Sequence, residues 1–459
     1  YVGKEDFLAG LRAYFVDHAF ANATFSDLLA ALEKSSGRDL SDWGAQWLRT
    51  TGLNTLSPDF DVDSDGKFTR FAVSQTGAAP GAGERRVHRI GVGIYDDVDG
   101  KLVRTDRVEL DLDAAESTNV DALVGVSRGK LVLVNDDDLT YCAVRLDPDS
   151  LDVLLSRIGD IAEPLPRTLA WSAAWEMTRS AEMKARDFVA LVQRGIGGET
   201  EVGVVQRLLV QAQTAISSYA DPAWAAEHGT PEFADALLEL ARSAEAGSDH
   251  QLAFVNALTG TELGDRHIGV LRALLDGDVE GQSLAGLGVD TDLRWRIVTA
   301  LAGAGAIDAD GVDSPVIDAE AAEDNTAAGA RSAAAARAAR PSAEVKEQAW
   351  TTVVDDDAVP NITARSIIGG FAGPGQGELL EPYVARYFDA IEGVWARRSS
   401  EVAQTVVVGL YPSWSISEQS LAAADEFLDG DLPPALRRLV IEGRAGIVRA
   451  LAAREFDAS

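Results

Sequence analysis

The stretch Leu379–Ile391, LLEPYVARYFDAI, shows the pattern that decides the fold class. Its apolar side chains recur every three or four positions, which places them on one face of an α-helix. Segments of the same kind, each long enough for one or two helices, follow one another from about residue 151 to residue 459, with Gly and Pro between them. We therefore predict a helical domain over residues 151–459, a HEAT-like superhelix of stacked helix pairs without a strict repeat motif.

Two segments of unusual composition lie inside this helical region. Ala319–Arg340 is rich in Ala, Glu and Arg, which favour a helix over a linker. Gly369–Gly377 is rich in Gly, but it lacks the G-K-[ST] ending of a phosphate-binding loop and no strand precedes it. We predict a helix for the first segment and a turn between helices for the second.

Residues 55–150 change to the alternating pattern of strands. In Val108–Asp113 apolar and acidic residues alternate, as in a strand with one face in water. The pairs Asp65-Gly66 and Asp99-Gly100 lie between apolar runs, where a hairpin turn needs positive φ. We predict a small antiparallel β-sandwich over residues 55–150. Its strands are expected at Lys67–Ser74, Arg89–Tyr95, Lys101–Leu112, Lys130–Val134 and Leu139–Leu146.

Residues 1–54 are predicted to form short amphipathic helices. Thr24, followed by Asp27 three residues later, has the pattern of a capping box, and Gly37 lies where a helix would end. Trp43 and Trp47 are one helical turn apart, so their rings are expected to share a partly buried face. The three segments together predict a mainly α, multidomain protein.

The charge of the chain excludes one class of partner. Asp and Glu number 73 against 41 Lys and Arg, which gives a formal charge of -32. Such a surface repels phosphate backbones, so we expect no nucleic-acid partner. No apolar run reaches the roughly 18 residues of a membrane span, so we expect no membrane association.

Cys142 is the single cysteine of the chain, so a disulfide within the chain and a zinc cage of thiolates are both impossible. This usage favours a reducing compartment, and we predict a cytoplasmic protein. The neighbours of Cys142 indicate a strand, so a buried structural thiol is favoured over a nucleophile.

Acidic strings offer the best candidates for a metal site, and they do not match the metal-binding templates. Asp61–Gly66, DVDSDG, matches the first half of an EF-hand loop, but the twelfth position, which needs a bidentate Glu, is Ala72. A solvated hairpin turn explains the string better. The chain has only 5 histidines, and none are spaced at i, i+4 for zinc.

Arginines at two places are candidates for substrate binding. The predicted last helix, about Pro434–Arg454, carries five arginines and one acidic residue, Glu442. These arginines can bridge neighbouring helices, or some can hold a substrate carboxylate, for which a guanidinium is suited. Arg437, Arg438 and, on another helix, Arg294 are the candidates. For Arg294 the alternative is a place beside an N-cap, Asp290, and a core aromatic, Trp295.

Several stretches, in their order along the chain, resemble one family. The first part resembles the end of the catalytic domain of aminopeptidase N, a family of zinc-dependent aminopeptidases of the gluzincin type. The later part resembles the actinobacterial form of that family. The stretches are Gly3–Phe15 (GKEDFLAGLRAYF), His18–Thr24 (HAFANAT), Ser36–Leu40 (SGRDL) with Trp43 and Trp47, Gly286–Trp295 (GLGVDTDLRW) and Gly409–Pro412 (GLYP).

The resemblance implies a fold and a role. The family consists of an N-terminal β-saddle, a thermolysin-like catalytic domain, a small β-sandwich and a helical bowl that closes over the active site. Residues 1–54 would then end the catalytic domain, and the zinc motif and catalytic residues would precede Tyr1. The resemblance therefore assigns no catalytic residue, metal ligand or cofactor to this chain. Alone it is expected to be inactive, with peptides and the missing N-terminal catalytic region as partners.

A second hypothesis is compatible with the residues. A free-standing helical superhelix can bind peptides or proteins on its concave face, with the β-sandwich as a spacer. Under this hypothesis residues 1–54 would be an isolated piece with apolar faces that need a partner.

Overall fold

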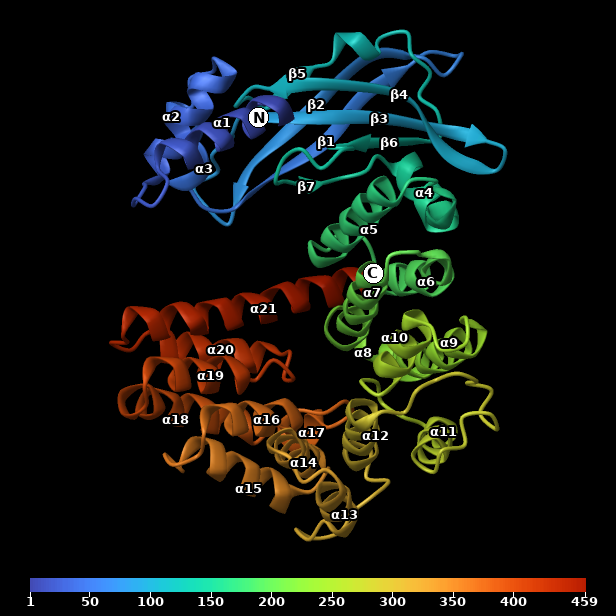
Figure 1. Cartoon of the computed structure of the whole chain (residues 1–459), viewed down its shortest axis with the longest axis vertical. Coiled ribbons are helices and arrows are strands. Elements are labelled where there is room, and N and C mark those ends of the chain that lie inside the picture. Colours follow the sequence, from blue (N-terminus) through green and yellow to red (C-terminus); the bar gives the residue numbers. More distant parts are fainter. The chain divides into compact units, whose positions relative to one another are not determined.

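The computed structural model describes all residues, 1–459, and divides into two compact units, Tyr1–Met177 and Thr178–Ser459 (Figure 1). The first unit holds three N-terminal helices, two small sheets and then α4 and most of α5, and the second unit is helical throughout. This confirms the predicted mainly α, multidomain fold. The predicted boundary between residues 54 and 55 lies inside the first unit and stays a prediction. No helix is both long enough and apolar enough to cross a membrane.

Two sheets form the β-sandwich of the first unit. One has the strand order β5-β2-β1-β7 and the other β4-β3-β6, and β1 contacts β6 across the interior. Ile90, Val92 and Ile94 of β3 are fully buried, so this strand lies at the centre of the core. The strands are β1 (Leu53–Val62), β2 (Phe68–Ala79), β3 (His88–Val98), β4 (Lys101–Leu112), β5 (Ser117–Asn119), β6 (Leu131–Val134) and β7 (Ala143–Val144).

The first strand was not predicted, and its proline explains why. β1 pairs with β2 over its whole length, although Pro58 in its centre lacks an N–H and argues against a strand. β7 pairs only with Thr55 and Leu56 of β1, so Pro58 lies beyond the part that is hydrogen-bonded on both sides. The acidic string after it is a hairpin turn, as expected, with φ of 74° at Gly66.

The N-terminal helices attach to the sandwich through a buried arginine. These helices are α1 (Lys4–Asp17), α2 (Phe25–Ser36) and α3 (Ser41–Leu48). Arg86 is 2% exposed, and its guanidinium donates to Gln46 O, Thr51 O and the side-chain oxygen of Asn54. Trp47 donates its Nε1–H to Val87 O at 3.2 Å. The end of α3 and the sandwich therefore share one polar network.

Large apolar side chains of the N-terminal helices remain in water. They lie on α1, in the connection to α2, at the first residue of α2 and at the end of α3. The predicted capping box at Thr24 and the left-handed Gly37 are both present in α2. Large exposed apolar side chains can mark an interaction site when they gather on one surface. The exposed residues are Phe7, Phe15, Val16, Phe20, Phe25 and Leu48.

The helical unit is a succession of packed helices (Figure 1). In one series of helices each member contacts the next. α6 contacts α7, and α7 contacts α10. Further along the chain α12 contacts α14, α14 contacts α16, α16 contacts α19, and α19 contacts α21. These helices are α6 (Ala185–Gly195), α7 (Val202–Thr214), α10 (Asp249–Leu258), α12 (Thr291–Gly303), α14 (Ala327–Ala339), α16 (Asn361–Phe371), α19 (Ser400–Gly409) and α21 (Pro434–Ala458). The others are α8 (Pro222–Trp224), α9 (Thr230–Ser243), α11 (Asp265–Leu275), α13 (Pro315–Glu323), α15 (Ala343–Val354), α17 (Gly377–Leu380), α18 (Tyr383–Arg397) and α20 (Glu418–Leu428). Two further helices, α4 (Pro148–Arg157) and most of α5 (Pro164–Arg179), follow the sandwich and belong to the first unit.

Close packing of α14 against α16 explains the Ala-rich segment. The segment forms two helices, because Asp324 ends α13 and Thr326 caps α14. Small side chains on α14 let α16 approach so closely that a Cβ on Gly370 would lie 2.1 Å from the carbonyl oxygen of Ala335. The segment is therefore a packed helix of the unit, as predicted, and not a linker.

The last helix returns to the first helices of the unit and closes it into a ring. Asp457 of α21 is fully buried, and its carboxylate accepts hydrogen bonds from Arg186 N and Nη2 at 3.0 and 2.9 Å and from Asp221 N at 2.8 Å. Arg454 donates to Ser217 O and Ser218 O, which belong to the π-helical turn η4 (Ala215–Tyr219). A π-helical turn leaves carbonyls outside the regular helix ladder, and here an arginine from the far end of the unit binds two of them.

Adding a methyl group at Gly370 should destabilise the helical unit. The Gly370→Ala variant is expected to lose roughly 1–3 kcal/mol, because its Cβ would overlap a backbone oxygen that cannot move independently. The neighbouring Gly369 has open space around its Cβ position, so Gly369→Ala is a matched control that should be neutral or slightly stabilising. Urea unfolding measures both, and equal effects would contradict the close approach.

Removing the charge of Asp457 should loosen the ring at its closure. We expect Asp457→Asn to cost roughly 2 kcal/mol, since a buried carboxylate with several donors loses charge-assisted hydrogen bonds. Hydrogen exchange should then accelerate in peptides from both ends of the unit, around Asp457 and around Asp221. Asp425→Asn removes a more exposed Arg444 pair and serves as the control. Unchanged exchange at both ends would contradict the closure.

Candidate functional site

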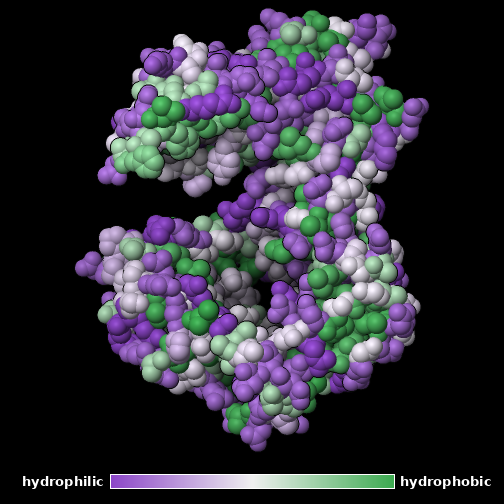
Figure 2. Space-filling view, in the orientation of Figure 1, coloured by the Kyte–Doolittle hydropathy of each residue, from purple (hydrophilic) through white to green (hydrophobic).

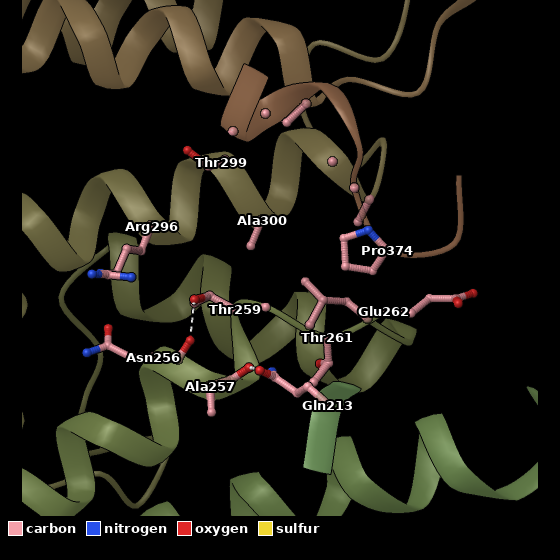
Figure 3. Close-up of a pocket in the computed structure, with 18 of the residues that line it drawn as sticks. Gln213, Asn256, Ala257, Thr259, Thr261, Glu262, Arg296, Thr299, Ala300 and Pro374 are labelled. Atoms are coloured by element: carbon pink, nitrogen blue, oxygen red, sulfur yellow. Dashed lines mark hydrogen bonds between the residues drawn. The ribbon is translucent and has the colours of Figure 1, made fainter. Parts of the chain in front are cut away.

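A cavity of about 1190 Å³ opens inside the helical unit. Its walls come from α7, α10, α12 and α14, from the end of α16 and from the connection Ala372–Gln376, which leads from α16 to α17 (Figure 3). Figure 2 shows the unit hollowed at this place, with polar and apolar residues around the opening. The predicted turn between helices is confirmed for Ala372–Gln376, whereas Gly369 and Gly370 still belong to α16 and Gly377 begins α17. The turn contributes a wall of the cavity, which the sequence did not indicate.

A second cavity, of about 660 Å³, lies next to the first. The two share the segments Gly260–Glu262 and Ala372–Gln376 as a common wall. The second cavity is lined further by apolar side chains, among them Ile216, Phe233 and Trp414, and by Arg454. The helix ends and loops on the concave side of the ring therefore form a continuous site with two compartments.

Three charged side chains on these walls are exposed and form no ion pair: Glu262, Asp292 and Arg296. Arg296 and Glu262 lie at opposite ends of the part of the cavity drawn in Figure 3, with Ala300 and Thr261 between them. Arg294, two residues before Arg296 on the same helix, is by contrast paired with Glu320. The unpaired charges of the cavity are thus available to a ligand.

Gln376 fixes the floor where three elements meet. Its Nε2 donates to Gly303 O at the end of α12 and to Ala339 O at the end of α14, at 2.9 and 2.8 Å. Its Oε1 is buried and has no donor. A buried amide oxygen without a partner is uncommon in native proteins and is costly unless a ligand or water satisfies it.

A buried lysine binds the same end of α14 that Gln376 contacts. Lys346 is fully buried, and its Nζ donates to Ala338 O at 2.7 Å while Phe371 lies 5.7 Å from the nitrogen. No carboxylate reaches it, so burial lowers the pKa of Lys346 to about 7. The C-terminal carbonyls of α14 therefore bind a lysine that gives up its proton near neutral pH.

The structure places the three predicted arginines in contacts within the fold. Arg294 forms a bidentate pair with Glu320, both bonds at 2.8 Å, beside the expected N-cap Asp290 and the buried Trp295. Arg437 donates to Leu428 O and Gly430 O. Arg438 is exposed and pairs with Glu442 at 3.3 Å.

None of these three arginines lines either cavity, and Arg296, two residues after Arg294, does. Their role in substrate binding stays a prediction. The functional candidates that sequence reasoning missed are Glu262, Arg296 and Gln376. A useful signal was the position of Arg296 one helical step from the buried Trp295, which places it on another face of α12.

The chain offers no donor set for zinc. No group of three or more His, Cys, Asp or Glu side chains lies close enough together to hold a metal ion. Burial raises the pKa of the Cys142 thiol to about 12, so it remains protonated and does not act as a ligand or nucleophile at neutral pH. The residues present do not fit the zinc site of a metallopeptidase.

Comparison with known proteins gives two kinds of match. The ERAP1-like C-terminal domain family matches residues 131–449. The chain is 48% identical over its whole length to aminopeptidase N of Streptomyces lividans, of which it covers 53%. It is 37% identical to aminopeptidase N of Lactococcus lactis over 14% of the chain and 8% of that protein. It is also 36% identical to the tricorn protease-interacting factor F2 of Thermoplasma volcanium over 16% of the chain and 9% of that protein. The chain thus spans about half the length of the Streptomyces protein, which it matches from its first to its last residue.

Titration of Lys346 should make stability depend on pH. The unfolded chain keeps the proton up to a pKa of about 10.5, whereas the folded chain loses it near 7, so stability should rise with pH between these values. Lys346→Met lacks this rise, and the gain in the free energy of unfolding across this pH range should be larger in the wild type by up to roughly 5 kcal/mol. Urea unfolding followed by circular dichroism at several pH values measures it, with the exposed Lys101→Met as control. Parallel profiles for the wild type and Lys346→Met would contradict the assignment.

Proposed function

Because the chain belongs to the family of ERAP1-like C-terminal domains, we propose that it is the C-terminal portion of a zinc-dependent aminopeptidase that removes N-terminal residues from peptides. The full-length similarity to the Streptomyces aminopeptidase N carries this proposal. The zinc ligands and catalytic residues belong to another part of the parent protein, and no catalytic step is assigned to residues of this chain.

The helical unit encloses the chamber in which the substrate is held and helps to admit peptides. Two observations support this role. The ring of helices has a two-compartment cavity on its inner side, and its walls carry unpaired charges of both signs, Arg296 and Glu262. A peptide has donors, acceptors and both charges, so a wall of this mixed character suits it better than an apolar or purely acidic wall.

The N-terminal helices dock the catalytic region of the parent protein. Their exposed apolar side chains, such as Phe15 and Phe20, form the surface that such a partner would cover. The parent acts in the cytoplasm, in keeping with a single cysteine and no disulfide. The proposed partners are the catalytic region and peptide substrates, without nucleic acid or a membrane.

The chain alone should bind no zinc and release no aniline dye from an alanine anilide. A chimera in which it replaces the matching portion of the Streptomyces aminopeptidase N should hydrolyse both the anilide and nine-residue peptides. In this chimera Ala300→Trp should lower kcat/KM for the peptides about tenfold and leave the anilide unchanged, since Trp fills the cavity wall at α12 without touching a small substrate.

Ala300→Ser is the matched control and should behave as the unmodified chimera. Zinc-dependent turnover by the chain alone would show that the division of roles is wrong. A folded chimera in which Ala300→Trp affects the anilide and the peptides equally would argue against the chamber role.

A further inference from the structure

Among the buried side-chain atoms of the two cavity walls, two hydrogen-bond acceptors and one donor have no partner. The buried Oε1 of Gln376, in the wall that both cavities share, accepts no hydrogen bond. The buried Oδ1 of Asn256 also accepts none, and Figure 3 shows this residue near Arg296, at the other end of the first cavity. Gln376 is 5% exposed, and its orientation is fixed because its Nε2 already donates to two carbonyls. Against these acceptors stands one buried donor, the indole Nε1 of Trp414. The unmatched groups favour a ligand rich in N–H donors.

Glu262 supplies the charge that such a ligand would need. It lines both compartments, is exposed and forms no ion pair. Its carboxylate lies against bare backbone, because a Cβ on Gly375 would be 2.9 Å from Glu262 Cδ. Figure 3 shows Glu262 beside Pro374, away from the other labelled charged residue. A ligand cation would meet no competing positive group of the protein at this end.

The other cations near the cavities do not take this position. Arg454 lines the second compartment, but its guanidinium donates to the carbonyls of Ser217 and Ser218. Arg296 lies at the opposite end of the first compartment. The carboxylate of Glu262 therefore has no cationic partner within the protein, and apolar side chains of the second compartment lie near it.

The second compartment provides that apolar surface. Ile216, Phe233 and the ring of Trp414 line it next to the shared wall. A long side chain with an aliphatic stem and a cationic head can lay its methylenes on such residues and keep its head at a carboxylate. An indole face also attracts a cation.

We propose that Glu262 binds the guanidinium of an arginine side chain in a peptide held by the helical unit. This inference rests on the proposed function, in which peptides enter these cavities. A guanidinium has five N–H donors in a planar fork, so it can pair with the carboxylate of Glu262 and still donate to the amide oxygen of Gln376 in the same shared wall. A lysine ammonium is instead a point charge with weaker geometric selectivity. The site thus selects an internal basic residue of the peptide.

The test compares two labelled nine-residue peptides, both amidated at the C-terminus, that differ only by arginine or citrulline at the centre. Citrulline keeps the shape and most of the N–H groups of arginine and lacks its charge. Fluorescence anisotropy with the 459-residue chain should give about tenfold tighter binding of the arginine peptide. Glu262→Gln should reduce its affinity to that of the citrulline peptide, whose own affinity should not change.

Asp292→Asn is the matched control, since Asp292 is an exposed, unpaired acid of the same cavity and should leave the preference intact. Circular dichroism and thermal unfolding check that both variants fold. Equal binding of the two peptides, or loss of the preference in Asp292→Asn, would overturn the inference.

The Ala300→Trp variant, which fills part of the cavity, distinguishes a wrong arginine site from a wrong proposed function. If Ala300→Trp weakens both peptides while the wild type does not discriminate between them, the peptide chamber stands and the arginine site is wrong. If Ala300→Trp changes neither affinity, or neither peptide binds the wild type, both proposals fall.

Discussion

The carboxylate of Asp457 holds together two ends of the helical unit that are more than two hundred residues apart in sequence. Each neighbouring helix pair contributes local contacts, but only a bond between the last helix and the first ones turns an open curve into a ring. The cavity walls on α7 and α12 keep their positions because this ring is closed. The candidate site is therefore a product of long-range closure, and no single segment contains it.

Backbone carbonyls, and not carboxylates, bind several of the deeply buried cations. Arg340 is 1% exposed and donates to the carbonyls of Asp308, Val312 and Asp313. The buried Arg86 and Lys346 also donate to backbone carbonyls. A carboxylate brought into the interior would itself need desolvation, whereas a helix-end carbonyl is already there and lacks a donor. The 73 acidic residues can thus remain mostly on the surface, where they repel anions and favour cationic ligands.

Local signals predicted the elements well, because their causes are local. The capping box at Thr24, the left-handed Gly37 and the Asp99-Gly100 hairpin turn depend on a few neighbouring residues, and all three occur as expected. The strand around Pro58 was missed, since its pairing depends on distant β2. Glu262 and Gln376 had no local signature, because the site arises only where α10, α12 and α14 converge. Arg294 was chosen for its chemistry, and the structure gives it a partner, Glu320. The helical segment that carries Glu320 was predicted, but its packing beside Arg294 is a long-range contact that the pattern does not encode.

The Arg86 network has a mechanical consequence. Since its guanidinium donates to the end of α3 and to β1 at once, the N-terminal helices and the sandwich cannot tilt independently without breaking several buried hydrogen bonds. A protein bound at Phe15 and Phe20 would therefore contact helices that are firmly joined to the β-sandwich. Force or displacement applied at that surface would be transmitted through the sheets as a rigid-body rotation rather than absorbed by bending.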